Sequence, residues 1–341
     1  MKLIAFLLLS LKLCPVAAQT LGGNAVFSFL DLPNSPQLTA LGGINNSVIT
    51  GDAGPSFANP ALLRPSMHGQ IDANFSSLYG GVRNYNCWAV VHSTKWQTSF
   101  AAGVNFLDYG DIIQTDPAGN ILGNIRPNDY VAQIAASRQY EKKWHYGVTV
   151  KFIHSMYGYY RSSGAALDIG FNYYDSARLL QAGLTLRNMG IQFQPYQGTS
   201  RGDLPFDLSL GITKRLSKAP IQFSFTAHHL QQFNIRYDDT AFNNSNGFDQ
   251  NNKNSSFTID KIFRHIILAA QIFPEDRVEI TLAYNYLRRK ELNIGEAGNG
   301  FTGFSLGLGV LLKKLELRYA RGFYTNTAGY NQFGLVLRLN D

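Results

Sequence analysis

From about residue 68 onward the sequence repeats one pattern, segments of roughly ten residues in which apolar and polar side chains alternate. The apolar Ile221, Phe223 and Phe225, for example, are interleaved with the polar Gln222 and Ser224. Successive strand residues point to opposite faces, so each segment has one apolar face and one polar face. No apolar run after the N-terminus reaches the roughly 18 residues that a membrane-spanning helix needs. The pattern predicts an all-β fold, a transmembrane antiparallel β-barrel.

About fourteen segments carry the pattern, and bacterial barrels have an even number of strands. The expected strands are 68–79, 85–95, 97–108, 130–140, 144–156, 164–174, 178–190, 205–216, 219–230, 262–273, 276–290, 301–312, 315–323 and 331–340. Every second connection is tight and often charged, as at 141–143 and 313–314, whereas the intervening ones are longer. This alternation is typical of short periplasmic turns and long outer loops, and it predicts that the long loops face the cell surface.

The composition agrees with a membrane barrel. Charged residues make up 16% of the 341 residues, whereas soluble domains have roughly 25%. The 23 phenylalanines and 18 tyrosines exclude a disordered chain, because they offer ample apolar surface to bury. An outer-membrane protein of a Gram-negative bacterium is the expected class.

Residues 1–18 have the features of a secretory signal peptide. Lys2 precedes an apolar stretch, and the small residues Ala17 and Ala18 provide a cleavage site. A lipoprotein signal at Cys14 is disfavoured, because a proline follows it. Cleavage after Ala18 lowers the formal net charge from +7 to +5, and it leaves Cys87 as the single cysteine. A single cysteine excludes an intramolecular disulfide and a cysteine-based zinc site.

Residues 19–67 lack the alternation and are rich in glycine, proline, asparagine and alanine. A segment of this size before the first strand predicts a hatch or plug, followed by the barrel at 68–341. Its candidate motif residues are Leu41, Gly42, Gly43, Asn59, Pro60 and Ala61.

Two phrases in this segment, 35–43 (SPQLTALGG) and 57–63 (FANPALL), resemble the hatch of fatty-acid-transporter-like barrels. Within that group the chain is most similar to the PorQ family of type IX secretion barrels, with further support from the phrases at 27–33, 186–190 and 204–206. The resemblance implies a fourteen-stranded barrel without enzymatic activity or cofactor. It also implies a PorZ-like surface protein as partner, with a PorU-like sortase and a PorV-like barrel in a larger complex. That attachment complex fixes secreted cargo to anionic lipopolysaccharide in the outer membrane.

Three long loops are the expected docking surface for such a partner, namely 109–129, 190–204 and 231–261. Their candidate polar contacts are chosen for exposure and charge: Asp116, Asn120, Asn124, Arg126, Arg236, Asp238 and Asp239. The asparagine-rich stretch 240–256 cannot form a core, so it is either a mobile surface loop or a segment that orders on a partner.

The polar faces of the strands predict what fills the lumen. Several charged residues of both signs are expected to point inward and to pair, since an unpaired buried charge is costly. The candidate lumen network is Asp168, Glu279, Glu316, Arg318 and Arg338. Such a lumen favours a plugged scaffold over a channel for small hydrophobic molecules, which would prefer an apolar lining. The channel stays open as the alternative function.

Enzyme and metal motifs are weak in this sequence. Residues 303–307 (GFSLG) match the nucleophile elbow G-x-S-x-G, but Ser305 falls within an expected strand instead of a strand-to-helix turn. His228 and His229 are adjacent in an expected strand, so their side chains should point to opposite faces and not share a metal. The sequence also lacks a phosphate-binding loop, and no catalytic residue, metal site or nucleic-acid partner is expected.

Overall fold

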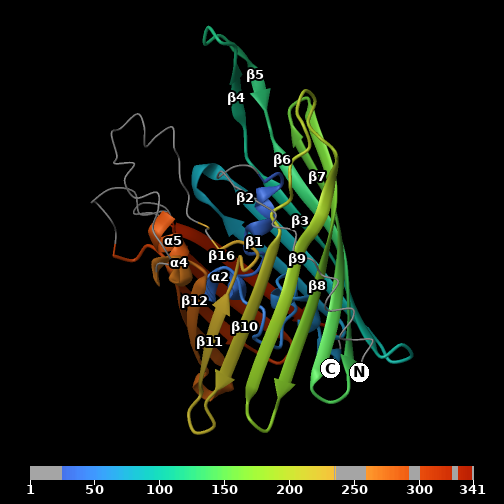
Figure 1. Ribbon diagram of the computed structural model, residues 1–341, viewed down its shortest axis with the longest axis vertical. Helices are drawn as coiled ribbons and strands as arrows, with labels where there is room; N and C mark the ends of the chain where they lie inside the picture. The colour runs from blue at the N-terminus through green and yellow to red at the C-terminus, as the bar shows by residue number, and fades with distance from the viewer. Residues whose placement is uncertain (1–24, 234, 236–258, 292–299, 325–328, 340–341) are drawn as a thin grey trace.

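A computed structural model describes residues 25–233, 235, 259–291, 300–324 and 329–339 (Figure 1). Fourteen antiparallel strands form a closed barrel in the order β1-β16-β15-β14-β13-β12-β11-β10-β9-β8-β7-β6-β3-β2. These strands are β1 (Gln70–Ser77), β2 (Arg83–Ser93), β3 (Thr98–Asp108), β6 (Asn128–Tyr140), β7 (Trp144–Tyr157), β8 (Tyr160–Asp175), β9 (Leu180–Gln194), β10 (Asp207–Arg215), β11 (Ile221–Ala227), β12 (Ile266–Ile272), β13 (Val278–Asn285), β14 (Phe304–Leu311), β15 (Leu315–Phe323) and β16 (Gly329–Arg338). The predicted fold class is confirmed, and each expected strand overlaps one observed strand. The expected signal peptide, 1–18, lies outside the described residues.

The two ends of the barrel differ. At the end that we call the tight-turn end, short turns join β2 to β3, β6 to β7, β8 to β9, β10 to β11, β12 to β13 and β14 to β15. The opposite end, the long-loop end, carries a separate two-stranded hairpin, β4 (Ile112–Thr115) and β5 (Ile121–Ile125), and the helices α4 (Ile259–Arg264) and α5 (Tyr286–Glu291). Figure 1 shows the hairpin projecting beyond the barrel strands. None of the helices in the described part of the chain has the length and apolar character that a membrane-spanning helix needs.

Helices α4 and α5 explain why two strands are shorter than expected. The predicted strand 276–290 ends at Asn285, because the side chain of this residue accepts a hydrogen bond from Arg288 N, 3.0 Å away, and so caps α5. The predicted strand 262–273 starts only at Ile266, because α4 occupies the preceding residues. The two helices contact each other through the Arg264–Glu291 ion pair.

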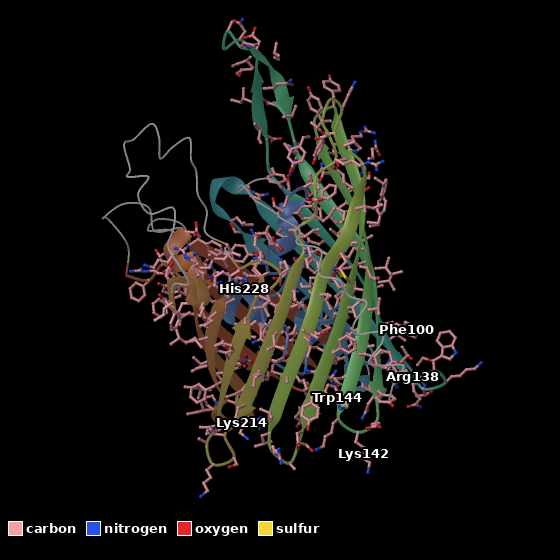
Figure 2. All side chains as sticks on the ribbon, viewed as in Figure 1. Phe100, Arg138, Lys142, Trp144, Lys214 and His228 are labelled. Carbon is pink, nitrogen blue, oxygen red and sulfur yellow. The ribbon has the colours of Figure 1, made fainter. Side chains whose placement is uncertain are left out.

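The strand faces follow the sequence pattern, with apolar side chains outward and polar side chains inward. On β7, Val148 and Val150 are exposed while Thr149 and Lys151 are buried. Figure 2 labels Trp144, Lys142 and Lys214 near the tight-turn end, which thus carries an aromatic ring and cationic side chains. Aromatic residues at strand ends are typical of the membrane–water interface.

The N-terminal segment occupies the lumen. We call its described part, residues 25–67, the plug. It contains the short helices η1 (Ser28–Asp31), α2 (Pro36–Ala40), η2 (Gly54–Phe57), η3 (Pro60–Leu62) and η4 (Pro65–Met67). Four of them have proline at the start, where its missing N–H costs no helical hydrogen bond. Nearly every residue from 35 to 64 is buried, and Figure 1 shows α2 enclosed by the strands.

Candidate functional site: the plugged lumen and the hairpin beyond it

A network of ion pairs joins the plug to the barrel wall. The guanidinium of Arg318 on β15 contacts three carboxylates: Asp52 at 2.8 Å, Glu279 at 2.6 Å and Glu316 at 3.2 Å. Glu316 also pairs with Arg338. Since all but Arg338 are nearly inaccessible to solvent, each charge depends on the others for compensation. The structure thus brings four of the five predicted network residues together and adds Asp52, which the sequence pattern did not single out.

The fifth residue, Asp168, lies elsewhere in the lumen. It pairs with Lys151 at 2.6 Å, and its Oδ1 accepts a hydrogen bond from Asn188 N at 2.8 Å. The register of β8 against β9 shifts between Leu167 and Ile169, and Asn188 has a left-handed φ of 57°. The Asp168 carboxylate therefore accepts the backbone N–H of Asn188 at the point where the register of the two strands shifts.

The hatch-motif residues Asn59, Pro60 and Ala61 fix the plug to β7 and β8. Asn59 Nδ2 donates to the carbonyl oxygens of Asn46 at 2.7 Å and Phe171 at 3.2 Å, and its Oδ1 accepts from Ala61 N at 2.9 Å. This approach requires glycine in the wall, since a Cβ at Gly170 would lie 1.9 Å from Asn59 Oδ1. One asparagine side chain thus caps η3 and bonds the wall.

The other hatch-motif residues, Leu41, Gly42 and Gly43, lie against β12, β13 and the start of α5. Leu41 is buried in an apolar cluster with the wall residues Ala269 and Ala283. Gly42 has a φ of 94°, which favours glycine, and its carbonyl oxygen accepts hydrogen bonds from Asn285 at 3.1 Å and Arg288 at 3.0 Å.

Apolar clusters fill much of the remaining lumen. In one of them Phe57 stacks on Trp88 of β2 with ring centroids 4.5 Å apart, and Trp88 Nε1 donates to Ser56 Oγ at 2.9 Å. A second cluster near the long-loop end contains Phe27, Phe29 and Leu30 of the plug. The cavity between the two clusters, lined in part by Leu30 and Phe57, has a volume of about 20 Å³, room for about one water.

The hairpin β4–β5 presents apolar side chains outside the barrel. Ile112, Ile113, Ile121 and Leu122 are all exposed, Ile121 to 72% and Ile113 to 61%. The hairpin shares no sheet with the barrel, and its base is held by the Arg126–Asp108 ion pair at 2.5 Å. This contact raises the pKa of Arg126. Exposed apolar residues in an isolated hairpin are typical of an interaction surface.

The predicted docking residues lie partly in this hairpin. Asp116 and Asn120 close its turn, since the Asp116 carboxylate accepts hydrogen bonds from the backbone and side chain of Asn120 at 2.8 Å. Those bonds lower the pKa of Asp116. Asn124 is paired with Ile113 in β5. The last three predicted residues, Arg236, Asp238 and Asp239, lie outside the described residues. Sequence reasoning named the polar residues of this loop and missed its apolar ones, although Ile-Ile and Ile-Leu pairs around a turn were a usable signal.

Two serine sites bear on catalysis. Ser305 belongs to β14, and its hydroxyl accepts a hydrogen bond from Arg288 at 3.0 Å, so it does not form a nucleophile elbow. On the neighbouring strands β7 and β8, His154 Nδ1 lies 2.8 Å from Ser163 Oγ. In the Ser-His-Asp arrangement Nε2 faces the serine and Nδ1 faces the acid, so this pair has a different geometry.

The expectation that His228 and His229 cannot share a metal is wrong. Atoms of both rings and of the Asp207 carboxylate all lie within 4.8 Å of one another. The strand rule fails here because β11 already ends at Ala227, and His229 has a left-handed φ of 53°. Because both histidines follow the end of the strand, their side chains are not forced to opposite faces.

The sequence matches no protein-family profile and no curated protein. Solved structures of outer-membrane channels resemble the barrel. The CymD monoaromatic hydrocarbon channel has a TM-score of 0.51 at 13% identity, covering 92% of this chain and 97% of that chain. A TodX monoaromatic hydrocarbon channel mutant has a TM-score of 0.53 at 11% identity, covering 90% and 98%. A FadL homologue from Pseudomonas aeruginosa has a TM-score of 0.50 at 10% identity, covering 90% and 98%.

These likenesses show the fold. The fold of the chain is similar to the barrel of the FadL homologue and of the hydrocarbon channels, in agreement with the barrel fold that the hatch phrases predict. Two of these similar structures are named as monoaromatic hydrocarbon channels.

Proposed function

We propose that this chain is a non-enzymatic outer-membrane anchor whose long-loop end faces the cell surface and docks a surface protein. The observation that carries the proposal is the hairpin β4–β5, which exposes four large aliphatic side chains beyond the barrel. In the membrane-facing wall such residues contact lipid, but the hairpin projects away from the wall (Figure 1). Burying them against a protein partner removes apolar surface from water and thereby stabilises the complex.

The filled lumen supports an anchor. Ion pairs hold the plug on one side, at Arg318, and hydrogen bonds hold it on the other, at Asn59. Transport through the lumen would require breaking both sets of contacts. Docking of a protein at the hairpin, in contrast, requires no displacement of the plug.

The partner follows from the sequence resemblance to PorQ-like barrels. We infer a PorZ-like surface protein on the hairpin and adjoining loops, with a PorU-like sortase and a PorV-like barrel in a larger type IX secretion complex. In this role the barrel holds the machinery that attaches secreted cargo to anionic lipopolysaccharide.

A pull-down of the full-length tagged chain from outer membranes in mild detergent tests the docking surface. The double variant Ile113→Ser/Leu122→Ser should recover at least about tenfold less of the surface protein than wild type, since central apolar contacts dominate interface energies. The matched control, Gln114→Ser/Asn124→Ser, changes two polar residues of the same hairpin and should recover the wild-type amount. Equal recovery by the Ile113/Leu122 variant would exclude the hairpin as the dock. Deleting 240–256, the asparagine-rich segment that could also bind the partner, tests that segment in the same assay. Unchanged recovery of the surface protein would exclude it.

A channel for small hydrophobic molecules is the second candidate function, and the fold likeness favours it at least as well as the anchor. The structurally similar proteins are named as monoaromatic hydrocarbon channels, and the apolar cluster around Phe27 and Phe29 would be the entry site. Co-purification of fatty acid with the barrel alone, or uptake of toluene by proteoliposomes that contain it, would support this function. An anchor predicts neither result.

A further inference from the structure

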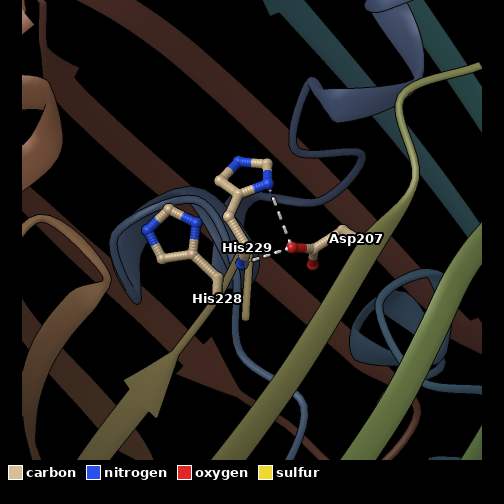
Figure 3. Close-up of side chains that lie close together, drawn as sticks. All are labelled: Asp207, His228 and His229. Carbon is tan, nitrogen blue, oxygen red and sulfur yellow. Dashed lines mark hydrogen bonds and ion pairs between the residues drawn. The ribbon is translucent and has the colours of Figure 1, made fainter. Parts of the chain in front are cut away.

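Three metal-ligating side chains converge at the long-loop end of the barrel, apart from the hairpin and the plug network. Asp207 begins β10, and His228 and His229 directly follow β11. One ligand atom of each lies within 4.8 Å of the others (Figure 3). The two imidazole rings have centroids 4.7 Å apart.

Backbone contacts hold this arrangement. His228 N donates to the carbonyl oxygen of His265 at 3.0 Å, which fixes the chain just beyond β11. His229 N donates to Asp207 Oδ1 at 2.7 Å, and His229 Nδ1 lies 3.3 Å from the same oxygen (Figure 3). The backbone of the two histidines is therefore anchored at both residues, and one Asp207 carboxylate oxygen lies close to the His229 ring.

Buried atoms in the cluster have no hydrogen-bond partner among the described residues. His228 is 2% exposed, yet neither of its ring nitrogens is hydrogen-bonded within the described part of the chain. Asp207 is fully buried, and its Oδ2 also has no hydrogen-bond partner among the described residues. Unpaired buried polar atoms are costly, and native structures keep few of them without a role. One imidazole nitrogen of His228 and Asp207 Oδ2 thus each offer an unpaired lone pair, which a cation could accept.

The surrounding charges permit a cation. Arg187 is the register partner of Asp207 on β9, and it also pairs with Asp31 of the plug at 3.5 Å. Two carboxylates thus face one guanidinium, which leaves a net negative charge for a bound ion. His229 is 28% exposed, so an ion can reach the cluster from the long-loop end.

We propose that Asp207, His228 and His229 bind a divalent transition-metal ion of the zinc type. Imidazole nitrogen with carboxylate oxygen suits zinc and its neighbours, whereas calcium and magnesium prefer oxygen alone. Tetrahedral zinc with bonds of about 2.0–2.2 Å needs the ligand atoms closer together than 4.8 Å, so the proposal requires the side chains to rotate toward the ion. Bound metal would tie the start of β10 to the end of β11 at the rim of the barrel. The site does not depend on the proposed docking function.

Titration with zinc ions alone tests the proposal. The full chain, purified in detergent with a tag that lacks histidine and treated with a chelator, should bind a single zinc ion per chain in isothermal titration calorimetry. The variants His228→Ala, His229→Ala and Asp207→Asn should each weaken the affinity at least about tenfold. His92→Ala, a histidine near the tight-turn end, should bind as wild type does.

Two controls keep the result decisive. Heat-modifiability on electrophoresis shows whether each variant still forms a barrel, and Asp207→Asn preserves the oxygen that His229 N contacts. Cobalt(II) added in place of zinc should give the intense absorption of a tetrahedral site in wild type and lose it in the variants. Absence of zinc binding by the folded wild type would overturn the proposal, as would unchanged affinity in the folded His228→Ala variant.

Discussion

Arg318 Nε and Asp52 Oδ2 lie 2.8 Å apart, and this contact joins a strand of the wall to a plug residue 266 positions earlier in the chain. The pair is enclosed by two further acids, Glu279 and Glu316. Together with Arg338, which pairs with Glu316, the Arg318 guanidinium therefore compensates three buried carboxylates. An ion pair therefore holds the plug to the wall at this point. Removal of the plug would leave Arg318 without Asp52 as a partner.

Replacing the arginine should be among the most damaging single changes in the chain. Arg318→Met leaves the buried carboxylates of Asp52 and Glu279 without their ion-pair partner, and we expect a loss of about 3–5 kcal/mol in the free energy of unfolding. Urea denaturation of the refolded barrel in detergent measures it. Lys142→Met, in an exposed tight turn, is the control and should change the value by less than about 0.5 kcal/mol. A similarly small effect of Arg318→Met would contradict the role of the network.

A methyl group at Gly170 should displace the hatch motif. The added Cβ would meet Asn59 Oδ1 at 1.9 Å, so Gly170→Ala should destabilise the protein by about 1–3 kcal/mol and increase proteolysis of the plug. Gly300→Ala, where a Cβ meets nothing within 4 Å, is the matched control. Because the clash involves Asn59, the effects of Gly170→Ala and Asn59→Ala should be less than additive in a double-mutant cycle. Full additivity would mean that the two residues do not interact.

The hydrogen bond between Ser56 and Trp88 gives a spectroscopic test of the plug. Ser56→Ala leaves the buried indole N–H unpaired, and we expect a loss of about 1–3 kcal/mol in stability with a shift of tryptophan emission. Ser93→Ala, near the tight-turn end of the same strand, should leave both unchanged. An unaltered emission spectrum in Ser56→Ala would contradict the hydrogen bond between Trp88 and Ser56.

The contact between α4 and α5 should weaken in acid. Burial raises the pKa of Asp260, but the hydrogen bonds from Arg264 and Tyr286 outweigh it, so the pKa lies below its ordinary value. A depressed carboxylate pKa contributes stability above the unfolded-state pKa of about 3.9, and this contribution is lost as the pH falls through the folded-state pKa. Hydrogen exchange of 259–264, corrected for its intrinsic pH dependence, should therefore accelerate in that window. Asp260→Asn should remove the pH dependence, and persistence of the acceleration in this variant would assign it to another group.

The strands could be predicted from the sequence because a membrane barrel imposes one rule on every residue of its wall. Outward side chains meet lipid and inward ones meet the plug, so the alternation survives throughout β7 and β13. Beyond the end of a strand this alternation no longer constrains the sequence, and there the predicted strand ends were wrong. The expected strand 276–290 continued past Asn285 because capping by a single asparagine side chain leaves no trace in the hydrophobic pattern.

The candidate sites could be predicted only in part for the same reason. Glu279, Glu316 and Arg318 belong to alternating strands, and their common face follows from parity. Asp52 belongs to a plug without periodicity, so only the tertiary fold brings it to Arg318. The His228–His229 cluster depends on a left-handed backbone beyond the last ladder residue, which strand parity cannot anticipate.

The barrel is closed by its own two ends, since Gln70 of β1 is paired with Arg338 of β16. One edge of β1 consequently has no partner until β16 pairs with it, and this edge is open to wrong pairing in the meantime. The plug precedes β1 and finds its anchor Arg318 only in the penultimate strand. The plug can therefore complete its ion pairs only once the penultimate strand is present, and a chain shortened by its final strand would keep an unsealed edge at β1.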